Sequence, residues 1–326
     1  MNEINNSKYS LYVKIFILPI IVLFFSYLVG IKDDSLWKDY ETYASYFSFS
    51  RYNNASEIFL NGTDPFFLMV MKPFTFDTNG FYVFTYFCAL VTLSLKFTAL
   101  YKSTDNFFIL IMLYSSYLLC LHDYVQIRIA LALSLVIFSI YVTSKTRSKI
   151  VFFILAGLIH LSSIVFSLAY LGYKVIGYKN FIRLLPLSLL APTLIFSGLL
   201  DIARLDTYVE LVSNKEQYYQ INIFASLPIL QLITVLFIAA NKNIRWAVSS
   251  FEYCLSLLGV VLFYALASIP VMAFRFSEMS IIFYLILLSN LFNHSNFIKL
   301  LCLLVVLAGL KNSFWGEQSL LNVFGG

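Results

Sequence analysis

The sequence predicts an all-α integral membrane protein that crosses the membrane many times, with about 9–11 transmembrane helices. Of its 326 residues, 60% are hydrophobic and only 12% are charged, whereas a soluble domain is about half apolar and a quarter charged. The apolar residues form long runs between short polar turns, and each run is about long enough to cross a hydrocarbon core of roughly 30 Å. We therefore expect a single transmembrane helical domain over residues 1–326.

Nine apolar runs are the expected membrane spans. The first follows two lysines and has no small-residue cleavage site after it, which predicts an uncleaved span rather than a signal peptide. The nine expected spans are residues 11–31, 81–101, 106–121, 125–143, 181–200, 223–240, 247–267, 276–292 and 297–310.

Two polar segments between these spans are longer than turns, and both are acidic. Residues 32–80 contain seven acidic and four basic side chains, and residues 201–222 contain four and two. The short turns at 144–149, 173–183 and 241–245 are basic and lack acids. Because basic turns stay on the cytoplasmic side, we expect 32–80, with an amphipathic helix, to be an outer loop and 201–222 to be a second one.

The run at 150–171 has basic turns on both sides, which one full span cannot satisfy if both turns are cytoplasmic. A re-entrant hairpin that turns near His160 would satisfy the rule, and "GLIHLSS" supplies Gly and polar residues at its midpoint. Non-helical backbone at such depth is tolerated beside protein or a water-filled cavity. The alternative is an ordinary span with one basic turn outside, which inverts the later loops.

Composition also limits the ligands. The four cysteines all fall inside apolar runs, and the three histidines have no zinc-site spacing relative to them. No Gly-rich phosphate loop or metalloprotease motif occurs, so we expect no metal and no cofactor. The net charge of +5 calls for no nucleic acid, because Lys and Arg retained on the cytoplasmic side explain most of it.

Arg128 is a candidate functional residue because it lies just inside the run "YVQIRIALAL". One interpretation is an interfacial anchor whose side chain reaches the lipid headgroups. The other is a fixed cation that faces a polar cavity. Arginine suits phosphate, since its planar fork binds two oxygens and stays protonated.

Arg275 and Glu278 form a second candidate, in "SIPVMAFRFSEMSIIF". Pro270 is expected to break the preceding span, so that a helix starts near Arg275 with Glu278 one turn further on the same face. The two side chains either neutralise each other or grip an anionic ligand together.

His160 is the only histidine deep in an apolar run. Such a histidine is either a hydrogen-bonded bundle residue or a functional group, since ionisable residues in membranes are often functional. An imidazole can take a proton near neutral pH.

The predicted outer loop carries a polar and aromatic face. At helical spacing, Asp39, Tyr43, Tyr46 and Ser50 line up. Aromatic rings and carboxylates together suit a sugar, while the alternative is an amphipathic helix that lies on the membrane surface. Asp64-Pro65 then leads into "FFLMVMKPFTF", a stretch too short to span.

In this order the segments resemble the EpsG-type branch of the Wzy polysaccharide polymerases. The resemblance rests on "KDYETY", "DPFFLMVMKPF", "QIRIALAL", "FFILAGLIHLSSIVF" and "RFSEMSIIFYLILL", over roughly residues 35–285. At the dipeptide before "FFLMVMKPF", this sequence has Asp64-Pro65, whereas the family often has Glu-Pro.

The resemblance implies a metal-independent glycosyltransferase in the bacterial inner membrane. Such an O-antigen polymerase moves a growing glycan from undecaprenyl pyrophosphate to a sugar hydroxyl of a lipid-linked repeat unit on the periplasmic face. A chain-length regulator is a further expected partner, besides the bilayer itself. The resemblance assigns Arg128 and Arg275 to the pyrophosphate and His160 to the base or to positioning of the acceptor; the expected substrate-binding residues are Asp39, Tyr40, Tyr43, Arg51, Asp64, Arg204 and Glu278.

Three other functions stay open from the sequence. A flippase or exporter of the same lipid-linked sugar would bury charges along a midplane path and often shows internal repeats. An O-antigen ligase usually has a longer outer loop with a histidine. A scaffold subunit would not need arginines inside the membrane boundary.

Overall fold

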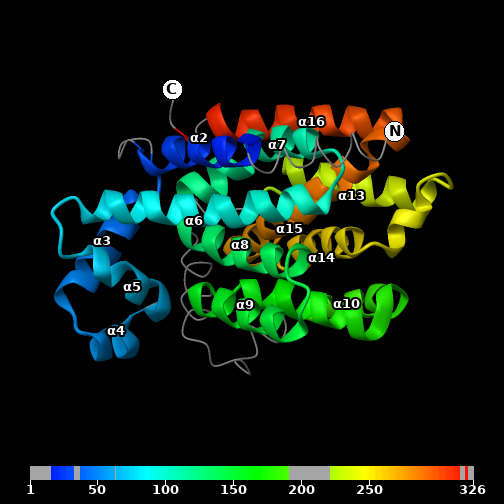
Figure 1. Cartoon of the computed structure of the whole chain (residues 1–326). Coiled ribbons are helices and arrows are strands. Elements are labelled where there is room, and N and C mark those ends of the chain that lie inside the picture. The colour runs from blue at the N-terminus through cyan, green and yellow to red at the C-terminus, as the bar shows by residue number, and fades with distance from the viewer. Residues whose placement is uncertain (1–15, 33–36, 63, 191–220, 316–319, 322–326) are drawn as a thin grey trace. The chain divides into compact units, whose positions relative to one another are not determined.

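The computed structural model describes residues 16–32, 37–62, 64–190, 221–315 and 320–321. Every regular element within these ranges is a helix, so the predicted all-α class is confirmed (Figure 1). Backbone contacts divide the chain into two compact units. Unit 1 comprises Met1–Phe107, Ser115–Ile164 and Leu310–Gly326, and unit 2 comprises Phe108–Tyr114 and Val165–Gly309. The expectation of one domain over the whole chain stays a prediction.

The elements of unit 1 follow the predicted order of span, loop and spans. They are α2 (Leu18–Gly30), α3 (Tyr40–Tyr52), α4 (Ala55–Asn61), α5 (Pro65–Met71), the 3₁₀ helix η3 (Lys72–Phe74), α6 (Gly80–Ser103), the π-helix η4 (Leu119–Val125), α8 (Ile127–Tyr141) and α9 (Thr146–Ile159). Three of the described helices cross the division: α7 (Phe107–Ser116), α10 (Ser163–Leu184) and α16 (Asn296–Phe314).

Unit 2 contains the second half of the bundle. Its elements are most of α10, the 3₁₀ helix η5 (Leu185–Leu190), α13 (Ser226–Ala240), the 3₁₀ helix η7 (Arg245–Ser249), α14 (Phe251–Ala265), α15 (Pro270–Leu291), the 3₁₀ helix η8 (Phe292–His294) and most of α16 (Asn296–Phe314). The expected loop at 201–222 and most of the expected span at 181–200 lie outside the described residues.

Among the described residues, three helices are long and apolar enough to cross a membrane: α6, the continuous Pro270–His294 segment of α15 and η8, and α16. The bent pair α7 and η4 would add a fourth if the two helices form one broken span. Five shorter apolar helices (α2, α5 with η3, α8, α13 and α14) correspond to further hydrophobic runs. Each expected span that is described therefore contains an apolar helix, and several are shorter than the runs suggested.

The core of unit 1 forms around α6 and α8. Helix α2 packs along α6, while α8 packs between α6 and α9 (Figure 1). Small side chains on α8 allow this approach, since Ala130, Ala132 and Ser134 are all buried. The outer face of α2 is different: Ile20, Phe24 and other large apolar side chains there are more than half exposed, as expected of a lipid-facing helix.

Unit 2 is organised by the close packing of α14 on α15. Gly259 lies so near α15 that a Cβ on it would be 1.9 Å from Ser280 Oγ and 2.2 Å from Ser280 Cβ. Next to this contact, Gln231 of α13 donates from Nε2 to Ser256 O (2.9 Å) and Ser280 Oγ (3.0 Å).

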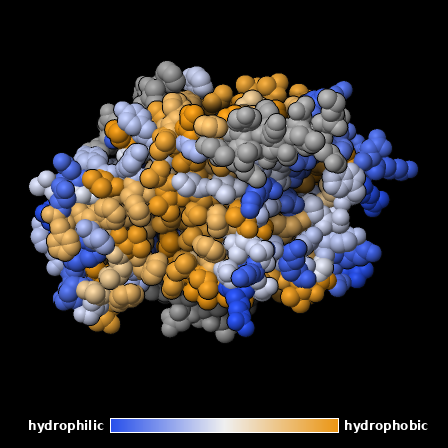
Figure 2. Space-filling view, in the orientation of Figure 1, coloured by the Kyte–Doolittle hydropathy of each residue, from blue (hydrophilic) through white to orange (hydrophobic). Residues whose placement is uncertain are grey.

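Apolar side chains dominate the face seen in Figure 2, with hydrophilic ones gathered toward its edges.

Two sequence expectations about helix ends can be compared with the structure. Helix α15 begins at Pro270 and not near Arg275, because proline is favoured in the first helical turn, where its missing N–H costs nothing. The run at 150–171 is interrupted where the turn was expected: α9 ends at Ile159, and His160 is extended (φ −153°, ψ 113°). A tight turn follows, with Ser163 N donating to His160 O (3.0 Å). The re-entrant hairpin itself stays a prediction.

Candidate functional site

Arg128 at the start of α8 meets a carboxylate and two tyrosines of the predicted outer loop. Its Nη1 forms an ion pair with Asp64, at the start of α5. Its Cζ lies 4.7 Å from the ring centroid of Tyr46 and 5.6 Å from that of Tyr43, within cation–π range. The Arg128 side chain is 15% exposed, so the guanidinium lies at the edge of the fold.

The loop helices are built to hold this arrangement. Pro65 starts α5 directly after Asp64, and Ser50 Oγ of α3 donates to Leu68 O of α5 (3.0 Å). At the same C-terminal end of α3, Lys72 Nζ donates to the carbonyls of Ser50, Arg51 and Asn53 (2.6, 3.1 and 2.8 Å). A lysine at a helix C-terminus satisfies carbonyls that have no partner within the helix.

The predicted face of α3 forms, but it points inward. Tyr43 is 2% exposed, Ser50 is fully buried and Tyr46 is half-buried. Tyr43 Oη accepts a hydrogen bond from the Arg128 backbone N–H (3.2 Å), and burial raises the pKa of Tyr43 despite the nearby Arg128. The face therefore packs against Arg128 and the other loop helices, and whether α3 also lies on the membrane surface stays a prediction.

A second cation, Lys32, lies at the end of α2. Its Nζ donates to Tyr124 O (2.5 Å) and lies 3.9 Å from the centroid of the Trp37 ring. Trp37 stacks on Tyr43, with 5.2 Å between the ring centroids. Burial lowers the pKa of Lys32 to about 7, although Asp123 and Asp39 act in the opposite direction. Lys32 is therefore poised to gain or lose a proton near neutral pH.

A third group of polar side chains is sealed inside unit 1. Lys96 in the middle of α6 and Asp123 on η4 form an ion pair of 2.7 Å, and both side chains are 0% exposed. His122 is also 0% exposed, and neither of its ring nitrogens has a hydrogen-bond partner among the described residues. His160 is 3% exposed and close enough to interact electrostatically with His122. Ionisable groups at such positions are expensive to bury.

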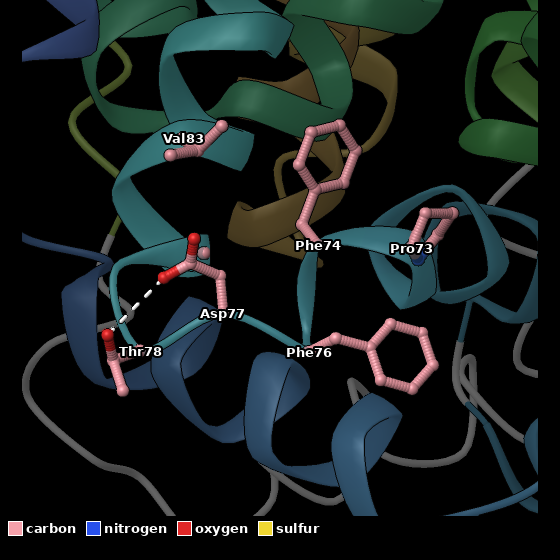
Figure 3. A pocket seen from close by; sticks show the side chains of 7 residues that line it. Pro73, Phe74, Phe76, Asp77, Thr78 and Val83 are labelled. Atoms are coloured by element: carbon pink, nitrogen blue, oxygen red, sulfur yellow. Dashed lines mark hydrogen bonds between the residues drawn. The ribbon is translucent and has the colours of Figure 1, made fainter.

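A pocket of about 660 Å³ opens beside the start of α6. Its lining combines the Phe74 and Phe76 rings with the Asp77 carboxylate and the Thr78 hydroxyl, which donates to Asp77 Oδ1 (3.3 Å; Figure 3). Gly80 closes the turn, because a Cβ there would be 1.7 Å from Phe74 O. The volume is in the usual range for ligand sites, and rings beside a carboxylate match the faces and hydroxyls of a sugar.

The structure brings together only some of the predicted site residues. Tyr43, Asp64 and Arg128 are in contact, and Tyr40 packs near them, 5.8 Å from the Trp37 ring. Asp39 precedes α3, and Arg51 is exposed at its far end. Within unit 2, Arg275 and Glu278 are half-buried on α15. Arg204 lies outside the described residues.

Sequence reasoning missed Lys32, Trp37, Lys96, His122 and Asp123 as parts of one site. A signal was present for Lys96, which is a lysine in the middle of an expected span. An ionisable residue inside a membrane segment indicates a partner in the same bundle. The identity of that partner, 27 positions away, could not be read from the spacing.

The fold and these buried charges define a helical membrane protein with ionisable groups inside its bundle. A family model of the EpsG family matches residues 15–322. The chain therefore belongs to the EpsG family, the family of Wzy-like polysaccharide polymerases, and the family assignment made from the sequence is confirmed. It identifies a membrane polysaccharide polymerase with a glycosyltransferase-like activity. No curated protein and no solved structure matches the chain.

Proposed function

We propose that this protein is an O-antigen polymerase of the bacterial inner membrane. It transfers a growing glycan from undecaprenyl pyrophosphate to a sugar hydroxyl of one lipid-linked repeat unit on the periplasmic face. The observation that carries the proposal is the setting of Arg128, a partly exposed guanidinium held by Asp64 and two tyrosines in a polysaccharide polymerase.

Arg128 has binding capacity left for an anion. Asp64 contacts Nη1 and the Tyr43 and Tyr46 rings lie beside the guanidinium, but 15% of the side chain remains exposed. An arginine presents five N–H donors in a fixed fork, and one carboxylate cannot saturate them. We assign this guanidinium to the pyrophosphate, with Arg275 as the second cation and Glu278 as its orienting carboxylate.

The chemistry balances without a metal. The acceptor hydroxyl oxygen forms a bond to the anomeric carbon of the growing glycan, and the bond from that carbon to the pyrophosphate oxygen breaks. The leaving pyrophosphate gains negative charge, which fixed cations stabilise in a low-dielectric site. The hydroxyl proton passes to a base, for which His160 is the proposed group. Since His160 is 3% exposed, this role requires the hydroxyl or a water chain to reach it.

The sugar units would contact the loop helices and the adjacent pocket. Asp39, Tyr40 and Tyr43 are proposed sugar contacts near Arg128, and the pocket lined by Phe76 and Asp77 extends the surface available to a longer glycan. Arg51 and Arg204 are reserve cations of the two predicted outer loops. A separate chain-length regulator is the proposed protein partner.

Replacing Arg128 with lysine tests the proposal. Arg128→Lys keeps the charge but removes the bidentate fork, so we expect loss of polymerisation while the protein stays in the membrane. Lipopolysaccharide from such cells should carry a single repeat unit, seen by gel electrophoresis. Arg275→Lys should give the same result. Lys102→Gln, at an exposed lysine near the end of α6, is the matched control and should leave the ladder intact.

Two outcomes would contradict the proposal. A normal ladder of chain lengths in both arginine variants would exclude their role at the pyrophosphate. Loss of all surface repeat units on deletion of the gene, even single ones, would favour a flippase, exporter or ligase.

A further inference from the structure

The junction between η4 and α8 is held by side chains from several other segments of unit 1. The π-helix closes with Gln126 N donating to Leu121 O (2.9 Å), and Gln126 itself is non-helical (φ −103°, ψ 64°). Ala130 N of α8 in turn donates to Gln126 O (2.9 Å), so this one non-helical residue joins the two helices. We call residues 123–128 the η4–α8 turn. π-Helical turns inside helical segments are often found at functional sites.

Side chains from five different places hold this turn. Lys96 of α6 pairs with the Asp123 carboxylate (2.7 Å). Lys32, after α2, donates to Tyr124 O (2.5 Å), and Trp37, before α3, donates from Nε1 to Val125 O (3.1 Å). At the end of the turn, Tyr43 of α3 accepts from Arg128 N and Asp64 pairs with the Arg128 side chain.

The ion pair is a poor choice if its only purpose is stability. Both side chains are 0% exposed, and desolvation of two charges can cancel their attraction. Replacing such a pair by apolar residues of similar volume is often neutral or stabilising. Its clearest benefit is geometric, since the pair joins Asp123 at the start of the turn to Lys96 in the middle of α6. The pair thereby fixes the start of the turn that ends at Arg128.

We propose that Lys96 and Asp123 are positioning residues for Arg128, which set where its guanidinium is presented to the substrate anion. This inference rests on the proposed role of Arg128 at the pyrophosphate. Lys32 and Trp37 complete the same support by holding two of the carbonyls between Asp123 and Arg128, those of Tyr124 and Val125. The pair acts through the backbone of the turn and touches no substrate. A misplacement of about 1 Å in such a group can cost about 100-fold in rate.

The test uses the full chain in membranes with the pair replaced as a unit. Lys96→Met combined with Asp123→Val removes both charges together, because a single change would leave an unpaired buried charge and endanger folding. We expect the double variant to reach normal amounts and to show a kcat about 10- to 100-fold lower, with little change in KM. Thr92→Val is the matched control: Thr92 is buried one turn away on α6, and its hydroxyl has no partner among the described side chains.

A second measurement separates this inference from the proposed function. Hydrogen exchange of the amides at 124–130 should be faster in the double variant than in Thr92→Val, whether or not Arg128 binds pyrophosphate. If Arg128→Lys keeps full activity but exchange is still faster, the proposed function fails and the anchoring of the turn stands. Wild-type kcat in the double variant, or unchanged exchange, would overturn the positioning role.

Discussion

The two units bury different kinds of polar groups. In unit 1 the polar side chains shielded from solvent include Lys32, Asp64, Lys96, His122 and Asp123. In the described part of unit 2 every fully buried polar side chain is neutral, such as Gln231, Thr234, Ser256 and Ser280.

The difference separates two uses of polarity in a bundle. The neutral groups of unit 2 hydrogen-bond between closely packed helices, as when Thr234 Oγ1 and Tyr284 Oη meet at 3.0 Å. Such contacts join helices at modest cost. The charged groups of unit 1 carry a larger desolvation cost, and they converge on one turn. Changes to the buried charged groups of unit 1 should therefore affect activity per molecule, while changes to the buried neutral groups of unit 2 should affect the amount of folded protein.

The largest effect on folding is expected from Gly259→Ala in unit 2. The new Cβ would overlap Ser280 Cβ and Oγ, and forcing extra volume into a packed core costs about 1–3 kcal/mol. We expect a lower melting temperature and less protein in the membrane, with activity per folded molecule unchanged. Adding Ser280→Gly removes both overlapping atoms and should restore much of the stability. If Gly259→Ala melts like the wild type, α14 and α15 are not packed as described.

A smaller effect is expected from pH on unit 1. Lys32 has a pKa of about 7 in the folded chain, below its ordinary value, so the unfolded chain holds more protons between about pH 7 and 10. Stability should therefore rise with pH in this window by up to about 1 kcal/mol per pH unit.

Lys32→Met should remove this pH dependence from unit 1 and leave unit 2 as it was. Hydrogen exchange of unit 1 peptides, corrected for the intrinsic effect of pH, measures it. Equal slopes in the wild type and in Lys32→Met would mean that Lys32 stays charged throughout, held by Tyr124 O and the Trp37 ring.

The smallest effect is expected at the pocket beside α6. Phe76 is 83% exposed, so Phe76→Ala should not change stability but should weaken sugar contact. A loss of about 1 kcal/mol corresponds to a roughly fivefold higher KM for the lipid-linked acceptor. Phe59→Ala, at an exposed ring of α4 outside the pocket, is the control. Equal KM values for both variants would exclude Phe76 from the acceptor site.

The long helices could be predicted from the sequence, since an apolar run of sufficient length has few structural alternatives in a membrane. The runs around α6, α15 and α16 illustrate this. The first and last residues of shorter helices such as α8 were harder to predict. There the chain changes from a π-helix to an α-helix at Gln126, and hydropathy does not register that change.

The individual site residues could be named more readily than their contacts. Arg128 and Asp64 were both chosen from the sequence, yet nothing in it indicated that they pair across 64 positions. Periodicity shows which residues share a helix face but not which faces meet. The same limit hid the hydrogen bond from Trp37 to Val125, which joins residues 88 positions apart.

The carboxylate of Asp64 also sets a condition for anything that binds Arg128. An incoming anion has to compete with a negative charge that is already attached and already oriented. A phosphodiester headgroup carries one charge and gains little by exchanging with a carboxylate. A pyrophosphate carries more than one, so exchange favours it. In the role that we propose for Arg128, its ion pair with Asp64 would therefore disfavour a singly charged lipid headgroup and favour the pyrophosphate.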